Sequence, residues 1–187
     1  MVYVFLANGF EETEAIAPID IMRRAGIDVE LIAIGDELCV MGSHGMSITA
    51  DKRIKDICVM DREPEMMVLP GGMPGTKNLL ACAPLCAMLT YANGKDIPIA
   101  AICAAPMVLG RLGILDDKTA VCYPGFEKEL TGAKLAKFSK VVNSKNVITA
   151  AGMGVAIPFG LAIVEKLRSK QEADKIAKSI IYSNITF

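Results

Sequence analysis

The sequence predicts an α/β domain in which helices cover both faces of a doubly wound, mostly parallel β-sheet. Short apolar runs alternate with helical patterns along the 187 residues, and the opening strand–helix–strand unit forms a right-handed crossover, which makes its two strands parallel. The composition agrees, because 52% of the residues are hydrophobic and strands buried on both faces need many apolar side chains. No linker, repeat or low-complexity segment interrupts the pattern, so we expect one domain over residues 1–187.

The first crossover occupies the N-terminal part of the chain. Residues 2–7 are typical of a strand, and the Asn8-Gly9 turn follows them. Residues 11–25 have helical spacing, with acids in the first turn and arginines in the last, as the helix dipole favours. We expect Pro18 to kink this helix and a second strand to run over residues 27–34.

The next elements lead to the centre of the predicted sheet. Residues 36–60 predict a small hairpin excursion at the sheet edge, and residues 65–72 predict a buried strand that ends in a glycine pair. Residues 78–93 are helical. A strand at 98–102 and a helix at 104–110 follow. The remaining elements are a strand at 119–124, a short helix at 126–132, a strand pair within 141–152, a helix at 155–168 and an amphipathic segment at 171–181.

Charge and hydropathy exclude several classes of partner. The net charge is −1, the isoelectric point is near 5.9 and no basic cluster stands out, so we expect neither nucleic acid nor a membrane as a partner. Charge, Gly or Pro interrupts every apolar run well short of the ~18 residues that a membrane span needs. The N-terminus lacks the basic region and cleavage site of a signal peptide.

The cysteines and the single histidine limit the possible metal chemistry. The six cysteines lack the paired C-x-x-C spacing of a zinc site, and we interpret them as reduced thiols of a cytoplasmic protein. Because His44 is the only histidine, the sequence excludes a multi-histidine metal site and leaves any cysteine–histidine hydrolase with one candidate base. We therefore predict no metal.

Residues 98–106 (PIAAICAAP) are the candidate centre of the site. A buried strand stops at Cys103 and passes at once into a helix, and Ala101 and Ala105 supply the small side chains that such a sharp turn needs. This turn would expose the sulfur at the carboxyl end of the sheet, beside a helix N-terminus that favours a thiolate. The alternative is a buried cysteine that packs as a small hydrophobe, and this segment alone leaves both readings open.

Two further loops are expected to meet Cys103 at the same edge of the sheet. The loop at 70–75 is rich in glycine, so the backbone N–H groups of Gly72 and Ala104 are candidate donors to a substrate oxyanion. The loop at 8–14 brings Glu11 and Glu14 to one face of the following helix, while Glu12 points elsewhere. Acids at a helix N-terminus also stabilise the helix by themselves, and a solvated, purely stabilising role is the alternative.

Five motifs carry a resemblance to a known family. They are GFEETEA at 9–15, PIDIMRRAGIDV at 18–29, VLPGGMPG at 68–75, AAICAAP at 100–106 and GLAIVEKL at 160–167, and together they resemble the ThiJ/PfpI superfamily in its DJ-one branch. The resemblance implies a flavodoxin-like homodimer whose nucleophile is Cys103. It also implies that Glu14 is held protonated and hydrogen-bonds the sulfur. Such a carboxyl should have a raised pKa, because two like charges in contact repel strongly in a low dielectric.

The sequence also departs from the family pattern. Many relatives carry a histidine where this chain has Tyr123, and peptidase-like members carry one where it has Ala104, so a thiol protease mechanism lacks an obvious base. His44 falls where relatives have a residue at the dimer interface. It is therefore a candidate, with Arg24, to reach a partner's pocket, although a surface turn is the alternative. Tyr123, Glu11, Arg24 and His44 are thus possible supporting residues around the pair.

The family resemblance implies chemistry on small carbonyl compounds. The leading hypothesis is a cofactor-free glyoxalase or deglycase, in which Cys103 adds to a 2-oxoaldehyde such as methylglyoxal and Glu14 moves protons. No metal, glutathione or nucleotide is needed. The alternative is a redox sensor or chaperone that responds to oxidation of Cys103. A thiamine-pathway enzyme or a peptidase is a further, weaker alternative.

Overall fold

The computed structural model describes residues 1–182 and contains, within them, a central sheet of seven strands in the order β10-β11-β7-β6-β1-β2-β5. Neighbouring strands are parallel except for the pair β10 and β11, which is antiparallel. The predicted α/β class with a mostly parallel sheet is therefore confirmed. The strands are β1 (Val2–Leu6), β2 (Val29–Ala33), β5 (Lys52–Arg53), β6 (Met66–Leu69), β7 (Ile99–Ile102), β10 (Val141–Ser144) and β11 (Val147–Ala150).

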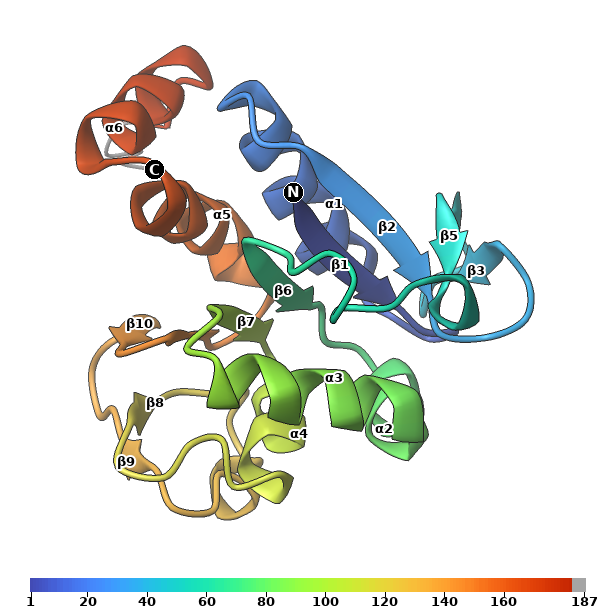
Figure 1. Cartoon of the computed structure of the whole chain (residues 1–187). Helices are drawn as coiled ribbons and strands as arrows, with labels where there is room; N and C mark the ends of the chain where they lie inside the picture. Colours follow the sequence, from blue (N-terminus) through green and yellow to red (C-terminus); the bar gives the residue numbers. More distant parts are fainter. Residues whose placement is uncertain (183–187) are drawn as a thin grey trace.

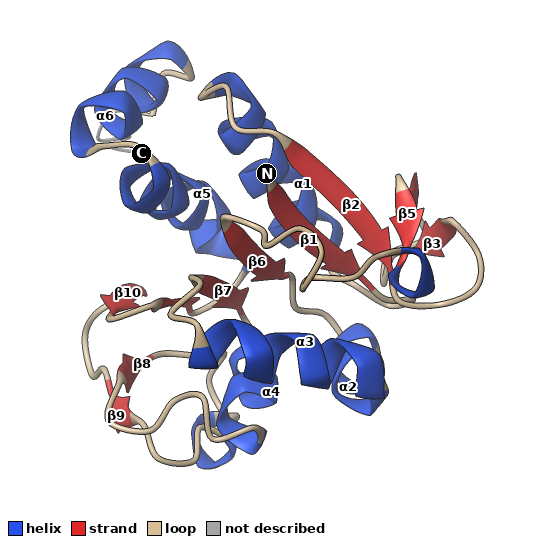
Figure 2. Cartoon of the chain, viewed as in Figure 1, coloured by secondary structure: helices blue, strands red, loops and turns tan. Residues whose placement is uncertain are grey.

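Helices cover both faces of this sheet (Figures 1 and 2). One face carries α1 (Glu12–Arg24), α5 (Ala156–Leu167) and α6 (Lys170–Ser179), and the other carries α2 (Gly75–Ala81), α3 (Ala83–Gly94) and α4 (Pro106–Arg111). Two apolar cores result, one on each side of the strands: Met22 and Phe159 belong to the first, and Leu85 and Leu89 to the second. Strands β1, β6 and β7 are fully buried, which explains the high apolar content of the sequence.

The excursion after β2 is a hairpin, as predicted. Strands β3 (Cys39–Met41) and β4 (Ser47–Thr49) pair antiparallel outside the central sheet. The chain then returns to the sheet edge as β5 and continues into η1 (Ile54–Asp56), which is one turn of 3-10 helix. Every helix described between residues 1 and 182 is too short or too polar to span a bilayer.

Three predicted elements differ from the structure. The helix expected at 78–93 is two helices that meet at Cys82, whose backbone is extended, because Pro84 lies at the start of α3 and cannot donate a helical hydrogen bond. The strand expected at 119–124 is only β8 (Thr119–Ala120), which pairs with β9 (Lys134–Leu135) in a separate small sheet. The helix expected at 126–132 is the 3-10 turn η2 (Glu127–Glu129). The end of the predicted domain, residues 183–187, lies outside the described residues.

The strand order reverses at the carboxyl ends of β1 and β6. Strand β2 lies on one side of β1 and β6 on the other, and ligands of open α/β sheets bind at such a reversal of strand order. Backbone hydrogen bonds tie together the two loops that follow these strands, from Glu11 N–H to Gly71 O at 2.9 Å and from Gly75 N–H to Gly9 O at 3.1 Å. The loop before α1 and the loop after β6 therefore form one surface.

Candidate active site

Cys103 occupies a strained turn between β7 and the helical turn that leads into α4. Its φ is +65°, in the left-handed region that residues other than glycine rarely adopt. The flanking Ala101 and Ala105 are completely buried, so larger side chains would not fit. The backbone geometry is that of a nucleophile elbow, and the sulfur lies on a half-buried residue at the carboxyl edge of the sheet.

The carboxyl group of Glu14 hydrogen-bonds the Cys103 side chain. Glu14 lies in the first turn of α1 and is only 1% exposed, so the solvated role considered for the acids of this turn is wrong for this residue. Two backbone donors hold the carboxylate: the Gly71 N–H, at 3.0 Å from Oε2, and the Met153 N–H. The acid therefore reaches the sulfur from a fixed, buried position.

Burial and mutual repulsion determine how the two groups titrate. Burial raises the pKa of Glu14 to about 7, although hydrogen bonds from Cys103 and from the two backbone donors act in the opposite direction. Burial and then the negative charge of Glu14 raise the pKa of the Cys103 thiol to about 12. The expectation of a raised acid pKa is confirmed. Because a negative charge on Glu14 raises the pKa of the thiol, the thiolate that the sequence predicts requires Glu14 to be protonated. Near neutrality the pair thus keeps at least one proton, which the two groups share.

The backbone N–H groups of Gly72 and Ala104 point at the sulfur. Both hydrogen-bond Cys103 and lower the pKa of its thiol, against the larger effects of burial and Glu14. Gly72 has a φ of +93°, and a Cβ at this position would lie 2.4 Å from the Glu11 nitrogen, so only glycine fits. An oxyanion that forms on an atom bound to the sulfur would lie near these donors.

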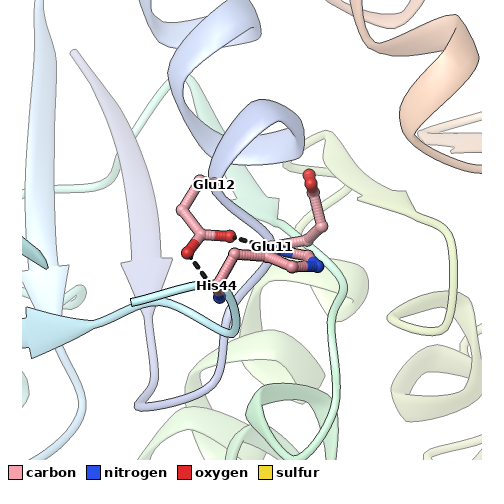
Figure 3. Close-up of side chains that lie close together, drawn as sticks. All are labelled: Glu11, Glu12 and His44. Atoms are coloured by element: carbon pink, nitrogen blue, oxygen red, sulfur yellow. Dashed lines mark hydrogen bonds and ion pairs between the residues drawn. The ribbon is translucent and has the colours of Figure 1, made fainter. Parts of the chain in front are cut away.

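The three acids at the start of α1 point in different directions. Glu11 is the N-cap, and its carboxylate accepts a hydrogen bond from the Glu14 N–H at 2.7 Å. Glu12 points away from the pair toward the β3–β4 hairpin, as its position in the helix predicts. Its carboxylate accepts hydrogen bonds from the His44 N–H at 2.7 Å and pairs with His44 Nδ1 at 2.9 Å (Figure 3).

The Glu12–His44 contact ties the hairpin to the first turn of α1. Burial alone would raise the pKa of Glu12, but hydrogen bonds from the side chain and backbone of His44 and from the Met46 N–H lower it to about 2. The same contact raises the pKa of His44. Glu11, Glu12 and His44 form the one group of three or more His, Cys, Asp or Glu residues within 1–182 whose ligand atoms all lie within 4.8 Å of one another. Because the hairpin already saturates the Glu12 carboxylate, we assign this cluster a structural role.

The structure separates the other supporting residues that the sequence suggested. Tyr123 borders the pair, since its N–H donates to the Cys103 carbonyl at 2.8 Å. Arg24 lies in the last turn of α1, where it pairs with Asp20 at 2.6 Å, and is not part of the site of its own chain. Met153 was not foreseen, because a backbone donor carries no signal in the sequence. For Gly71, the sequence indicated only that it belongs to the glycine pair at the end of a predicted strand.

Comparisons with known proteins agree with this arrangement. The family model described as "DJ-1/PfpI family" matches residues 1–166. Protein DJ-1 homolog B of Arabidopsis thaliana is 33% identical over 96% of this chain, which spans only 41% of that protein. A glutathione-independent glyoxalase of Caenorhabditis elegans, DJR-1.2, is 32% identical over 91% of this chain and 89% of its own length. The structure of oxidized Toxoplasma gondii DJ-1 superposes with a TM-score of 0.92 at 36% identity and covers 97% of this chain and 98% of that one.

Proposed function

The chain belongs to the DJ-1/PfpI family, and from this premise we propose that it is a cofactor-free glyoxalase or deglycase that acts on 2-oxoaldehydes such as methylglyoxal, or on their early adducts with protein thiols and amines. The observation that carries the proposal is the contact between the half-buried Cys103 sulfur and the buried Glu14 carboxyl. A relative that is named a glutathione-independent glyoxalase supports the choice of substrate class.

The first step joins the sulfur to the aldehyde carbon of methylglyoxal. The Glu14 carboxylate takes the thiol proton while the sulfur attacks, because a thiol with a pKa of about 12 needs a base in contact. The carbonyl electron pair moves to oxygen, where the N–H groups of Gly72 and Ala104 stabilise the oxyanion. Protonation of this oxygen by Glu14 gives a hemithioacetal and restores the carboxylate.

The second step is an internal rearrangement of the bound substrate. Glu14 takes the proton from the former aldehyde carbon and returns it to the neighbouring carbon, while the hydroxyl proton of the hemithioacetal passes to the former ketone oxygen. One carbon is thereby oxidised and the other reduced with no external electron acceptor. The product is a thioester of lactate on Cys103. Water then cleaves the carbon–sulfur bond, releases lactate and restores the thiol. A carboxyl with a pKa of about 7 suits both directions of proton transfer at neutral pH.

The decisive experiment compares cysteine variants of the full chain. Cys103→Ser should abolish the production of lactate from methylglyoxal, whereas Cys58→Ser, at an exposed cysteine on another loop, should leave it unchanged. Glu14→Gln should lose most activity while the fold is retained. Lactate production by Cys103→Ser at the wild-type rate would refute the glyoxalase and the deglycase assignments together.

A redox sensor or oxidation-dependent chaperone is the second candidate function. The half-buried sulfur next to an acid that can donate a hydrogen bond favours it, because a sulfinate on Cys103 would accept that bond. Mass spectrometry after mild peroxide treatment separates the two functions. Selective addition of two oxygens at Cys103, in a protein that turns over no aldehyde, would favour the sensor.

We also propose that the protein is a cytoplasmic homodimer. Six cysteines without disulfide bonds suit a reducing compartment. The exposed Ile16 and Ile157, on α1 and α5, offer an apolar surface for a second copy. Sedimentation of the purified protein tests the dimer, and a monomer at micromolar concentration would contradict it.

A further inference from the structure

The ring of Tyr123 packs directly on the backbone that carries one of the Glu14 donors. A Cβ placed on Gly152 would lie 3.3 Å from Tyr123 Cδ2 and 3.8 Å from Cε2, so the ring occupies the space beside this glycine and leaves little room for a side chain there. Gly152 is followed by Met153, which begins a single 3-10 turn closed by the hydrogen bond from Val155 N–H to Gly152 O at 2.9 Å. The Met153 N–H in turn bonds the Glu14 carboxylate.

The backbone of Tyr123 is fixed independently of its ring. Its N–H donates to the Cys103 carbonyl at 2.8 Å, and the Cys103 N–H donates to the Ala150 carbonyl at 2.9 Å. Two residues earlier, the Val121 N–H donates to the hydroxyl of Thr149, a residue that is completely buried, at 3.0 Å. The backbone of Tyr123 is therefore anchored to Cys103, while its ring lies against the Gly152–Met153 segment that binds Glu14.

We propose that Tyr123 is a positioning residue: its aromatic ring holds the Gly152–Met153 backbone against α1, so that the Met153 N–H stays on the Glu14 carboxylate. The ring, and not the hydroxyl, performs this role, because the ring makes the contact with Gly152 and half of the side chain remains exposed. For catalysis the inference rests on the proposed function, since it matters there only if Glu14 is the proton carrier. The geometric claim stands without it.

The direction of the effect follows from the chemistry of the Met153 bond. A donor to a carboxylate favours the charged form, and this N–H lowers the pKa of Glu14 against the larger effect of burial. If the ring is removed, the Gly152–Met153 segment is free to move away and the carboxylate loses a donor. Its pKa should then rise further above the value of about 7.

The test measures the pKa of Glu14 by carbon-13 NMR of the labelled side-chain carboxyl, with the signal assigned by its loss in Glu14→Gln. We expect Tyr123→Ala to raise the titration midpoint by about one pH unit, the size expected for loss of one hydrogen bond to a charged group. Tyr123→Phe should keep the wild-type midpoint. Tyr91→Ala removes a ring from the distant helix α3 and is the matched control.

Two outcomes would overturn the proposal. The first is a wild-type midpoint in Tyr123→Ala, and the second is an equal shift in Tyr123→Phe, which would assign the effect to the hydroxyl. Should Tyr123→Ala fail to fold, Gly152→Ala replaces it as the test variant. Its added methyl group would crowd the Tyr123 ring and disturb the contact between the ring and the Gly152–Met153 backbone, so it should also raise the titration midpoint of Glu14. The readout needs no turnover, so a protein inactive on methylglyoxal would refute the proposed function and leave this inference testable.

Discussion

The amide nitrogen of Gly71 lies 3.0 Å from Oε2 of Glu14, and the space between the two residues admits no side chain. A Cβ on Gly71 would lie 2.5 Å from that oxygen and 2.7 Å from Cβ of Cys103. The backbone just after β6 thus lies against both Glu14 and Cys103. Gly71 joins the two groups of the candidate site through its backbone, and its lack of a side chain is a condition for their contact.

Gly71→Ala should therefore disrupt the pair. The added methyl group has to displace the Glu14 carboxyl or the Cys103 side chain, so we expect a loss of methylglyoxal turnover of about 10²-fold, the cost of misplacing a reacting group by roughly 1 Å. The kcat/KM for lactate formation measures it. Gly94→Ala, in open space at the end of α3, is the control and should keep wild-type activity. Unchanged activity in Gly71→Ala would mean that the contact is dispensable.

Glu14 should make the fold less stable as the pH rises. Its pKa is about 7 in the folded protein, against an ordinary value of 4.5, so between these values the folded state binds more protons than the unfolded state. The free energy of unfolding therefore falls across this window, by up to about 3 kcal/mol for a shift of this size. Urea denaturation of wild type and Glu14→Gln at pH 5 and pH 8 measures the effect. The variant should gain stability relative to wild type at pH 8, and a constant difference would contradict the raised pKa.

Much of this site was predictable from the sequence because its groups follow strand ends. Cys103 and Gly72 lie just after the buried strands β7 and β6, and Glu14 lies in the first turn of the helix that follows β1. The carboxyl ends of parallel strands meet at one edge of the sheet. The charge state of the sulfur was not predictable. It depends on the burial of Cys103 and on the charge of Glu14, and both are properties of the assembled site.

The shortened strand at 119–124 and the missed burial of Glu12 have a common origin, in contacts between residues far apart in the sequence. Residues 119–124 have strand composition, but hydroxyl groups of Ser144 and Thr149 take the N–H groups of Thr119 and Val121, so this segment does not join the ladder of the central sheet. The burial of Glu12 was missed for the same reason. Its partners belong to a hairpin more than 30 residues away; His44, for example, is 32 residues from Glu12 in the sequence. No local sequence pattern predicts such contacts.

Turnover should depend on pH through Glu14. If the carboxylate is the base that takes the Cys103 proton, kcat/KM for methylglyoxal rises with pH and levels off above the pKa of Glu14, which is about 7. The residual activity of Glu14→Gln should lack this rising limb, while Cys58→Ser should retain it. A wild-type profile that is flat between pH 5.5 and pH 8.5 would remove Glu14 from the role of base.

The His44–Glu12 contact should stabilise the protein most in mildly acidic solution. The pKa of His44 is raised above 6.5 by Glu12, so its contribution is fully present below pH 6.5 and is lost as the pH rises through the folded value. The pKa of Glu12 is lowered to about 2, so its contribution is present above pH 4.5 and is lost in stronger acid. Both contributions coexist between pH 4.5 and pH 6.5.

Thermal unfolding of wild type and His44→Gln tests this window. Glutamine keeps a hydrogen-bonding side chain and the backbone N–H that binds Glu12, but it cannot carry the positive charge. The difference in Tm between the two proteins should be largest near pH 5.5 and should shrink by pH 9. Added salt should reduce it further, because the imidazole is 68% exposed and mobile ions screen its charge. An equal difference at pH 5.5 and pH 9 would show that the imidazole acts through packing or neutral hydrogen bonding, and the hairpin would then hold α1 by contacts that do not titrate.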